Sequence, residues 1–335
     1  MNSREIVEAA LNFAGPERIP MSLPEPYPND FVGAGIARDP ERPGVPWHRT
    51  ETGWAMIDEW GNTWNRLEGF SKGEVAKGVL ADWSDFDTYQ FPCYDHPEQY
   101  LGMQVRFAST PDKYHIAHLP GFPFSIARKM RRMELFLMDL HLERDRVMEL
   151  LSAIEDLLAT MIHHIAATDA DAIMFAEDWG TQDRLLIHPQ MWREIFKPGF
   201  DRLCSLAHSH GLKVFMHSCG YIYDIIPDLI EVGVDVLQFD QPRLHGISNL
   251  ARDFGGKVTF WCPVDIQTTL QTKDLHLIEQ DAKQMIEELG RFNGGFIAGY
   301  YSGNEAIGLE RQAQDFACRA FVKYGSEKEY QVRLE

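Results

Sequence analysis

The sequence predicts an α/β fold, a (β/α)8 TIM barrel with an elaborated insertion after the first strand. From about residue 169 onward, short apolar runs alternate with longer amphipathic segments, which is typical of repeated βα units. The apolar runs are almost continuously hydrophobic, as expected for parallel strands that are buried on both faces. A chain of 335 residues has room for seven or eight such strands in one barrel.

Before the regular part, the pattern predicts strands at residues 18–23 and 114–118 and a helix at 124–140. A longer helix is predicted at residues 144–166, because its apolar side chains recur on one face at helical spacing. Residues 27–92 are rich in Pro, Gly and Trp and do not follow the barrel rhythm. We interpret them as an insertion or lid within a single domain that spans residues 1–335.

The regular part contains five predicted strands and four predicted helices. The strands are residues 172–176, 212–217, 234–239, 257–261 and 294–298, and the helices are residues 188–210, 223–232, 274–291 and 305–324.

The composition excludes several classes of protein. The chain has 32 Lys and Arg against 50 Asp and Glu, a formal net charge of −18. Such an acidic chain without a basic segment is not expected to bind nucleic acid or an anionic membrane surface. Neither a membrane-spanning apolar run nor a secretory signal is recognisable, so we expect a cytoplasmic protein. The five cysteines have no regular spacing, which argues against a disulfide framework.

A metal site is predicted at the end of the strand at residues 212–217. His217 and Cys219 are two positions apart, and in extended backbone such residues point to the same side. An imidazole and a thiolate there suit zinc. Cys262 and Asp240 follow neighbouring strands and are candidates for further ligands. The alternative is structural: a hydrogen-bonded core histidine, core-filling cysteines, and an aspartate that caps a turn or pairs with an arginine.

Further polar residues lie at other strand ends. Glu177 and Asp178 follow one strand directly and are candidates, together with Asp240, for acid–base or electrostatic roles. Only one of these two adjacent residues is expected to face a pocket. The structural alternative is that Asp178 caps a turn and Glu177 pairs with an arginine. The predicted substrate contacts are Gln182, Tyr114, His115 and Tyr301.

Several segments together resemble the uroporphyrinogen decarboxylase superfamily, and more closely its corrinoid-dependent methyltransferase branch. They are NFAGPERIPMSL, DEWGNTW, EDWGTQDRLLIHPQMWREIFKP, HSCG and GGFIAGYY, and the resemblance covers nearly the whole chain. It implies transfer of a methyl group from a small methylated donor to cobalamin, with His217 and Cys219 as zinc ligands. The chain contains no D-x-H-x-x-G cobalamin-binding pattern, so the cobalamin is expected on a separate corrinoid protein.

The sequence departs from the family in two places. The decarboxylases carry an arginine-rich R-Q-A-G-R segment, whereas this chain has MSLPEPYPND, so porphyrinogen decarboxylation is not expected. The methyltransferases carry a late zinc-binding cysteine, which GGFIAGYYSGNEAIG lacks. Either Cys262 or Asp240 completes the site, or metal binding is weak or lost. A decarboxylase or lyase acting on a small acid and a non-catalytic binding barrel remain alternatives. The oligomeric state is open, with a homodimer among the forms considered.

Overall fold

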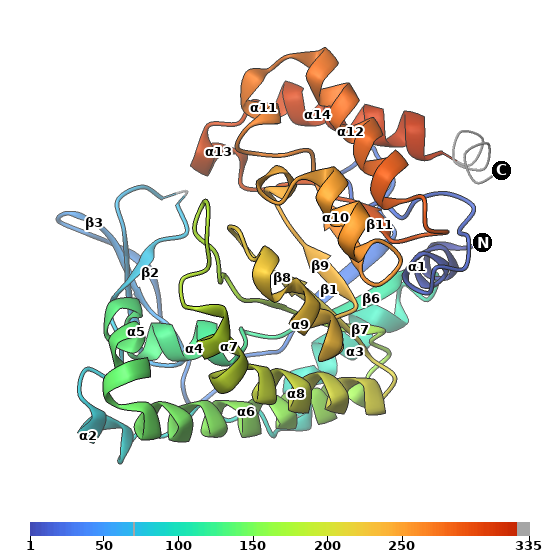
Figure 1. Cartoon of the computed structure of the whole chain (residues 1–335). Coiled ribbons are helices and arrows are strands. Elements are labelled where there is room, and N and C mark those ends of the chain that lie inside the picture. The colour runs from blue at the N-terminus through green and yellow to red at the C-terminus, as the bar shows by residue number, and fades with distance from the viewer. Residues whose placement is uncertain (70, 327–335) are drawn as a thin grey trace.

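The centre of the molecule is a parallel sheet of seven strands in a computed structural model that describes residues 1–69 and 71–326 (Figure 1). The strand order is β1-β6-β7-β8-β9-β10-β11, so from β6 to β11 each strand pairs with the next strand in the sequence. The strands are β1 Phe31–Gly35, β6 Tyr114–His118, β7 Ala172–Ala176, β8 Lys213–His217, β9 Val236–Gln238, β10 Thr259–Cys262 and β11 Phe296–Ala298. The predicted α/β class is confirmed, and the strand at 172–176 has the predicted bounds.

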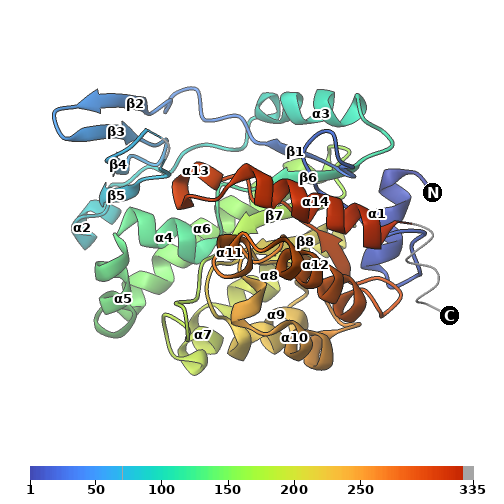
Figure 2. The ribbon, with the colours of Figure 1, turned by 90° about the horizontal axis from the view of Figure 1, so that it is seen from above.

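Helices surround this sheet (Figures 1 and 2). They are α1 Ser3–Leu11, α2 Trp83–Phe86, η1 Pro97–Tyr100, α3 Leu101–Ala108, α4 Pro123–Met130, α5 Met133–Leu142, α6 Arg144–Ala166, α7 Pro189–Ile195, α8 Lys197–Ser209, η2 Tyr223–Ile225, α9 Ile226–Glu231, η3 Pro242–Leu244, α10 Ile247–Phe254, α11 Thr269–Thr272, α12 Leu275–Leu289, α13 Asn304–Ile307 and α14 Arg311–Gly325. The long helix α6 has the predicted bounds, and most of its apolar face is buried.

Three predicted helices are each divided into two. Residues 124–140 divide between α4 and α5, because Arg132 adopts a φ of 66° between them. Residues 188–210 form α7 and α8, and Pro198 in the first turn of α8 cannot donate the hydrogen bond that would continue α7. Residues 305–324 divide into α13 and α14, separated by Gly308 with a φ of 68°.

The eighth strand of the predicted barrel is not formed among the described residues. Residues 18–23 make only isolated bridges, a parallel one from Met21 to Ala298 and an antiparallel one from Ser22 to Asn29. Pro20 lies within this segment and Pro24 directly follows it, and both lack the N–H group that a longer ladder needs.

The predicted insertion at residues 27–92 has a different extent. Its early part contains β1, which pairs in parallel with β6 and belongs to the main sheet. The rest forms a separate antiparallel sheet of four strands, β2 Val45–Thr50, β3 Gly53–Ile57, β4 Thr63–Arg66 and β5 Glu74–Lys77. Figure 2 shows this sheet projecting beside α4 and α5. The sequence FVGAG of β1 did not indicate a strand, because glycine has low strand propensity.

Two apolar cores hold the layers together. A large core lies between the parallel sheet and its helices. A smaller core fills the inside of the curved sheet: Val7, Leu11, Phe31, Tyr114, Ile116, Ala172, Phe215, Val236 and Ile297. Since Val7 and Leu11 come from α1, that helix closes the amino-terminal end of the sheet.

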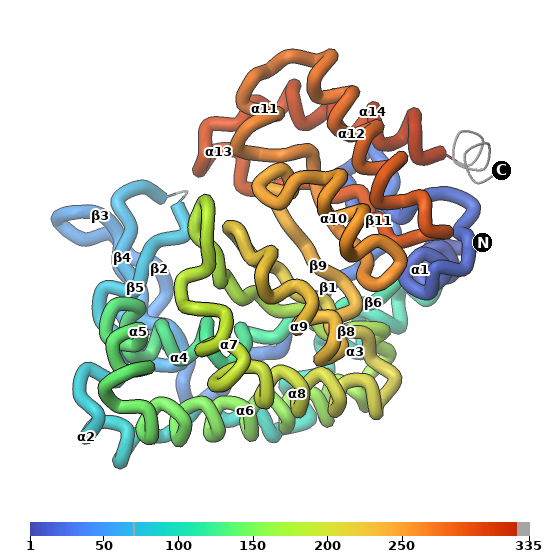
Figure 3. The backbone as a smooth tube through the Cα atoms, viewed as in Figure 1, coloured from blue at the N-terminus to red at the C-terminus, as the bar shows by residue number. Residues whose placement is uncertain are grey.

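The first and last parts of the chain lie side by side, as the tube in Figure 3 shows around α1 and β11. The N–H of Gly295 donates to the carbonyl of Ala10 at 3.0 Å, and the N–H of Ile19 donates to Gly325 at 3.2 Å. Across residues 1–69 and 71–326, no helix has both the length and the hydrophobicity needed to cross a membrane.

Candidate functional site

The loops after β7 and β8 are held in direct backbone contact. The N–H of Gly180 donates to the carbonyl of Cys219 at 3.3 Å. A Cβ at Gly180 would lie 2.3 Å from the Tyr221 nitrogen, and one at Gly220 would lie 2.2 Å from the Gly180 oxygen. Gly220 also has a φ of 79°, which other residues rarely adopt. Only glycine fits at these two positions, and their contact brings the two loops together.

This contact brings together Asp178, His217 and Cys219, whose ligand atoms all lie within 4.8 Å of one another. The Cys219 sulfur is 3.3 Å from His217 Nε2, and that nitrogen is 3.6 Å from Asp178 Oδ1. The same carboxylate oxygen accepts the Cys219 N–H at 2.9 Å. Nitrogen and sulfur ligands of one tetrahedral zinc ion lie about 3.5 Å apart, so the donor set and its spacing fit zinc.

A chain of hydrogen bonds orients the imidazole. His217 Nδ1 is hydrogen-bonded to the Gln238 side-chain oxygen, and Gln238 Nε2 donates to Asp240 Oδ1 at 2.8 Å. Because Gln238 presents an acceptor, Nδ1 carries the proton and Nε2 keeps its lone pair toward Cys219 and Asp178. Metal-binding histidines are commonly fixed in this way by a partner on the second ring nitrogen.

The site has an excess of acidic groups. Burial, reinforced by the nearby Asp178 and Asp240 carboxylates, raises the pKa of the Cys219 thiol to about 12. Arg128 Nη2 lies 3.4 Å from Asp178 Oδ2, on the side away from Cys219. A bound cation would compensate this cluster and favour the thiolate.

A cavity of about 490 Å³ opens next to this cluster at the carboxyl ends of the strands. It is lined by Lys72, His118, Leu119, Met174, Phe175, Ala176, His217, Gln238, Asp240, Trp261, Tyr300, Tyr301 and Ser302. The predicted residues His217, Asp240 and Tyr301 therefore share one cavity. Its position agrees with the general location of active sites in barrels of this kind.

A family model described as uroporphyrinogen decarboxylase (URO-D) matches residues 98–300, which is more than half of the chain. The chain belongs to the uroporphyrinogen decarboxylase family. No curated protein sequence matches it significantly.

One solved structure supports the fold of this URO-D family protein over nearly the whole chain. A methyltransferase from Methanosarcina mazei is 13% identical, with a TM-score of 0.68, over 97% of this chain and 99% of that chain. An endo-β-1,4-xylanase from Gloeophyllum trabeum is 12% identical, with a TM-score of 0.42, over 70% of this chain and 81% of that chain. At these identities the likeness to the methyltransferase concerns the fold alone.

Glu177, predicted as catalytic, does not reach the cavity of this URO-D family protein. Its side chain is 0% exposed and accepts the N–H of Ser125, in the first turn of α4, at 2.9 Å. Burial raises the pKa of Glu177 to about 8. Adjacent residues of extended backbone face opposite sides, so Asp178 faces the cluster and Glu177 faces α4.

Three further predicted residues do not line the cavity. Tyr114 begins β6 and belongs to the apolar core inside the curved sheet, at the opposite end from the cavity. His115 faces outward, where its ring nitrogens lie 2.7 Å from the Asp169 carbonyl and 2.8 Å from the Thr110 carbonyl. Gln182 is exposed on the loop after β7 and does not line the cavity.

Cys262, predicted as a metal ligand, is outside the group of three. It is 0% exposed in the large core between sheet and helices, and burial raises the pKa of its thiol. The neighbouring Trp261 packs against the inner core and lines the cavity. The alternation of strand side chains therefore turns Cys262 away from the site.

Sequence reasoning gave no role to Trp261 or Lys72, which line the cavity, and it considered His118 only as polar lining near the strand at residues 114–118. Trp261 is next to the last residue of its strand, so the rule that active groups follow strand ends could have found it. Lys72 comes from the loop between β4 and β5, and no local pattern points to its position.

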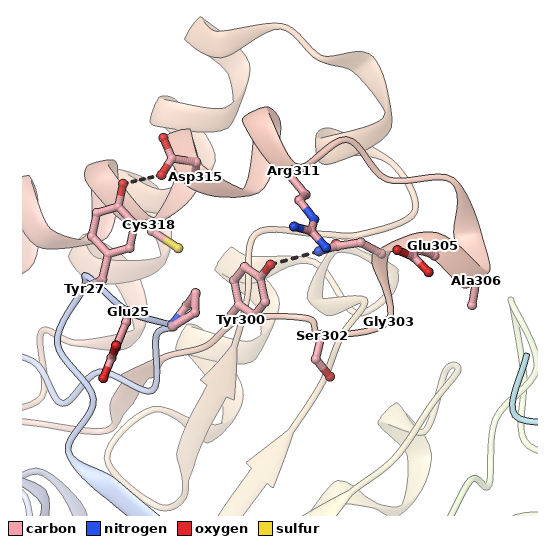
Figure 4. A pocket seen from close by; sticks show the side chains of 12 residues that line it. Glu25, Tyr27, Tyr300, Ser302, Gly303, Glu305, Ala306, Arg311, Asp315 and Cys318 are labelled. Carbon is pink, nitrogen blue, oxygen red and sulfur yellow. Dashed lines mark hydrogen bonds between the residues drawn. The ribbon is translucent and has the colours of Figure 1, made fainter. Parts of the chain in front are cut away.

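A second cavity of about 460 Å³ adjoins the first and shares Tyr300 and Ser302 with it. Figure 4 shows Arg311 and Tyr300 among the side chains that line it. Asn304 Nδ2 donates to the Tyr300 hydroxyl at 2.9 Å, and the Tyr27 hydroxyl donates to Asp315 at 2.5 Å. Tyr300 is thus fixed as the partition between the two cavities.

Proposed function

We propose that this chain is a methyltransferase or demethylase component that moves a methyl group from a small methylated donor to a corrinoid carried by a separate protein. The observation that carries the proposal is the convergence of Asp178, His217 and Cys219 beside a cavity at the carboxyl ends of the strands. Membership of the URO-D family and the fold shared with a methyltransferase are consistent with it.

The metal in this proposal is zinc, held by His217, Cys219 and Asp178. Asp178 takes the place that the family resemblance gives to a late cysteine, and Cys262 is left out because it faces the helix layer. When bound, zinc supplies Lewis-acid polarisation of the heteroatom that carries the methyl group. Gln238 keeps His217 in the tautomer that zinc requires.

The cavity supports a donor of about one aromatic ring. Its volume of about 490 Å³ is at the lower part of the range for small-molecule sites and far exceeds what a one-carbon alcohol needs. Trp261, Tyr300 and Tyr301 offer flat apolar walls, while Asp240 and the metal cluster form one polar side. An aryl methyl ether therefore fits the chemistry of this cavity.

We also propose that residues 18–23 occupy the eighth strand position, so that the observed sheet of seven strands belongs to a (β/α)8 barrel. Support comes from the parallel bridge between Met21 and Ala298 of β11 and from the N–H of Ser22, which donates to Ala298 at 2.8 Å.

The test combines elemental analysis with methyl transfer. Purified protein is expected to hold about one zinc ion and, with reduced cobalamin and a panel of aryl methyl ethers, to form methylcobalamin, measured by absorbance. His217→Ala and Cys219→Ser are expected to lose the zinc and at least about 100-fold in rate. Cys93→Ser is the matched control, because Cys93 is also a partly exposed free thiol but lies outside the cluster.

If the panel yields no methylcobalamin, the methyl-transfer proposal is wrong. Zinc content unchanged in both ligand variants would contradict the metal assignment. Release of carbon dioxide from a small acid would instead favour the decarboxylase alternative.

A further inference from the structure

His118 is a side chain of the main cavity to which the proposed function gives no role. It ends β6, and its register partner on β7 is Met174, whereas His217 is the partner of Ala176. His118 therefore lies two residues deeper than His217, which is about 7 Å along the strand direction. Tyr114 and Ile116, on the same face of β6, belong to the apolar core inside the curved sheet. His118 is the first residue of this face that borders the cavity, at its floor.

The imidazole of His118 has free hydrogen-bonding capacity. Within residues 1–69 and 71–326 it has no hydrogen bond, ion pair or ring-stacking partner. Three other histidines have protein partners: His115 bonds to two carbonyls, His217 to Gln238, and His245 to the Ile222 N–H. A polar group that faces a cavity without a protein partner is suited to bind a ligand.

The floor around His118 is otherwise apolar on its protein side. Met174 lies at the same depth, and Phe215, the register partner of Met174, belongs to the apolar core. Trp261 pairs with Gln238 and so lies level with His217, and Gln238 is already engaged with His217 and Asp240. Burial lowers the pKa of His118, so the neutral imidazole, with one donor and one acceptor nitrogen, prevails at pH 7. A ligand that reaches the floor would meet this ring as its hydrogen-bonding partner.

Gly33 on the neighbouring strand β1 provides the space for the ring. A Cβ at Gly33 would lie 2.5 Å from His118 Nε2 and 3.1 Å from Cδ2, so any larger residue would displace the imidazole. Gly35 has the same orientation two residues later, but a Cβ there would meet nothing within 4 Å. Neither glycine has a positive φ, so alanine is compatible with the backbone at both positions.

We propose that His118 is a substrate-binding residue, whose imidazole hydrogen-bonds to a hydroxyl of a single-ring ligand or to an oxygen other than the one that carries the transferred methyl group, and that Gly33 leaves room for the imidazole in this position. The ligand class rests on the proposed function. The role of His118 deepens that function by adding a polar contact at the floor, remote from the Asp178–His217–Cys219 cluster. Specificity then depends on the part of the donor that does not react.

The experiment measures binding of 2-methoxyphenol by titration calorimetry, with zinc content and thermal unfolding as parallel readouts. Gly33→Ala and His118→Phe are expected to weaken binding about 10-fold, because each removes a hydrogen bond at the floor. His118→Gln keeps a donor and an acceptor and is expected to remain within about 3-fold of the wild type. Gly35→Ala is the matched control and is expected to bind as the wild type does.

A double-mutant cycle tests whether Gly33 and His118 affect binding through the same contact. In the His118→Phe background, Gly33→Ala is expected to weaken binding no further, since the imidazole it displaces is already absent. All variants are expected to keep their zinc. If Gly33→Ala does not fold, the His118 variants, in which Gly33 is unchanged, still test whether His118 binds the ligand.

The outcomes separate this inference from the proposed function. Equal binding by the wild type, Gly33→Ala and His118→Phe would overturn the role of His118, even if methyl transfer is observed. Lack of wild-type binding at millimolar concentration would overturn it as well. Weakened binding in these variants without any methyl transfer would support His118 and contradict the methyl-transfer proposal.

Discussion

The two ends of the parallel sheet are built from opposite kinds of residue. At the amino-terminal end, large apolar side chains such as Phe31, Ile116 and Phe215 fill the interior, and α1 covers them. At the carboxyl-terminal end, small Ala176 and polar groups such as His217 and Asp240 line a cavity. The same strands thus contribute packing at one end and chemistry at the other, as expected for barrels of this kind.

This difference is sharpest within β6. Ile116 and His118 are two residues apart on the same face of one strand, yet Ile116 is 2% exposed in the apolar core and His118 borders the cavity. The boundary between the stabilising end and the functional end therefore falls between these two residues. The comparison can be tested by substitutions on either side of it.

The largest effect on stability is expected from Ile116→Ala. Removing this side chain leaves a cavity in the inner core and should lower the free energy of unfolding by about 2–5 kcal/mol, measured by urea denaturation. The rate of methyl transfer per folded molecule should stay within about 3-fold of the wild type, because the substitution is below the cavity floor. A large loss of rate with unchanged stability would contradict the division between the two ends.

The carboxyl-terminal end should also be the more acid-sensitive one. Burial lowers the pKa of His245 to about 4, and its Nε2 accepts the N–H of Ile222, in the loop that follows Cys219, at 3.1 Å. Since the folded-state pKa lies below the ordinary value near 6.5, folding favours the neutral imidazole. The stability contributed by His245 is therefore complete above pH 6.5 and is lost as the pH falls toward 4, by up to about 3 kcal/mol.

The check is the pH dependence of thermal unfolding in the wild type and in His245→Gln. The glutamine variant does not titrate, so its midpoint should decrease less between pH 7 and pH 4.5. Parallel pH curves for the two proteins would show that His245 does not contribute to this acid sensitivity.

The smallest effect is expected from Gln238→Ala, which removes the partner of His217 Nδ1 and leaves the three metal-binding side chains in place. Zinc affinity should fall about 10–100-fold, measured by competition with a chelator. Gln182→Ala is the control and should have no effect, because Gln182 is exposed and outside the cavity. If both substitutions leave zinc affinity unchanged, Gln238 does not orient His217.

The sequence was most informative where a local pattern determines geometry. The spacing of His217 and Cys219 predicted that they share a side of the chain, and their side chains do lie together. The addition of Asp178 depended on the contact between Gly180 and Gly220, which are 40 residues apart and cannot be paired from sequence periodicity. Cys262 was misplaced because the register of β10 decides which of two adjacent residues faces inward.

Two other residues were misplaced because the direction of their strand was not considered. Tyr114 and His115 were predicted as substrate contacts from their position near a strand, but they begin β6, whereas His118 ends it. The strand β1 was missed because of its glycines, and Gly33 is one of the residues that leave space for His118. The strand pattern of β1 is weak because Gly33 has to leave room for His118 on the neighbouring strand.

The contact between α1 and the last strand has a consequence for synthesis of the protein. Backbone hydrogen bonds join Ala10 to Gly295, Ile19 to Gly325 and Ser22 to Ala298, so each bond links residues that are roughly 280 to 310 positions apart in the chain. Such long-range contacts require closure of a loop that is nearly as long as the chain. The joining of the first and last parts of the chain is therefore expected to be among the last folding events, when chaperones have their greatest opportunity to bind.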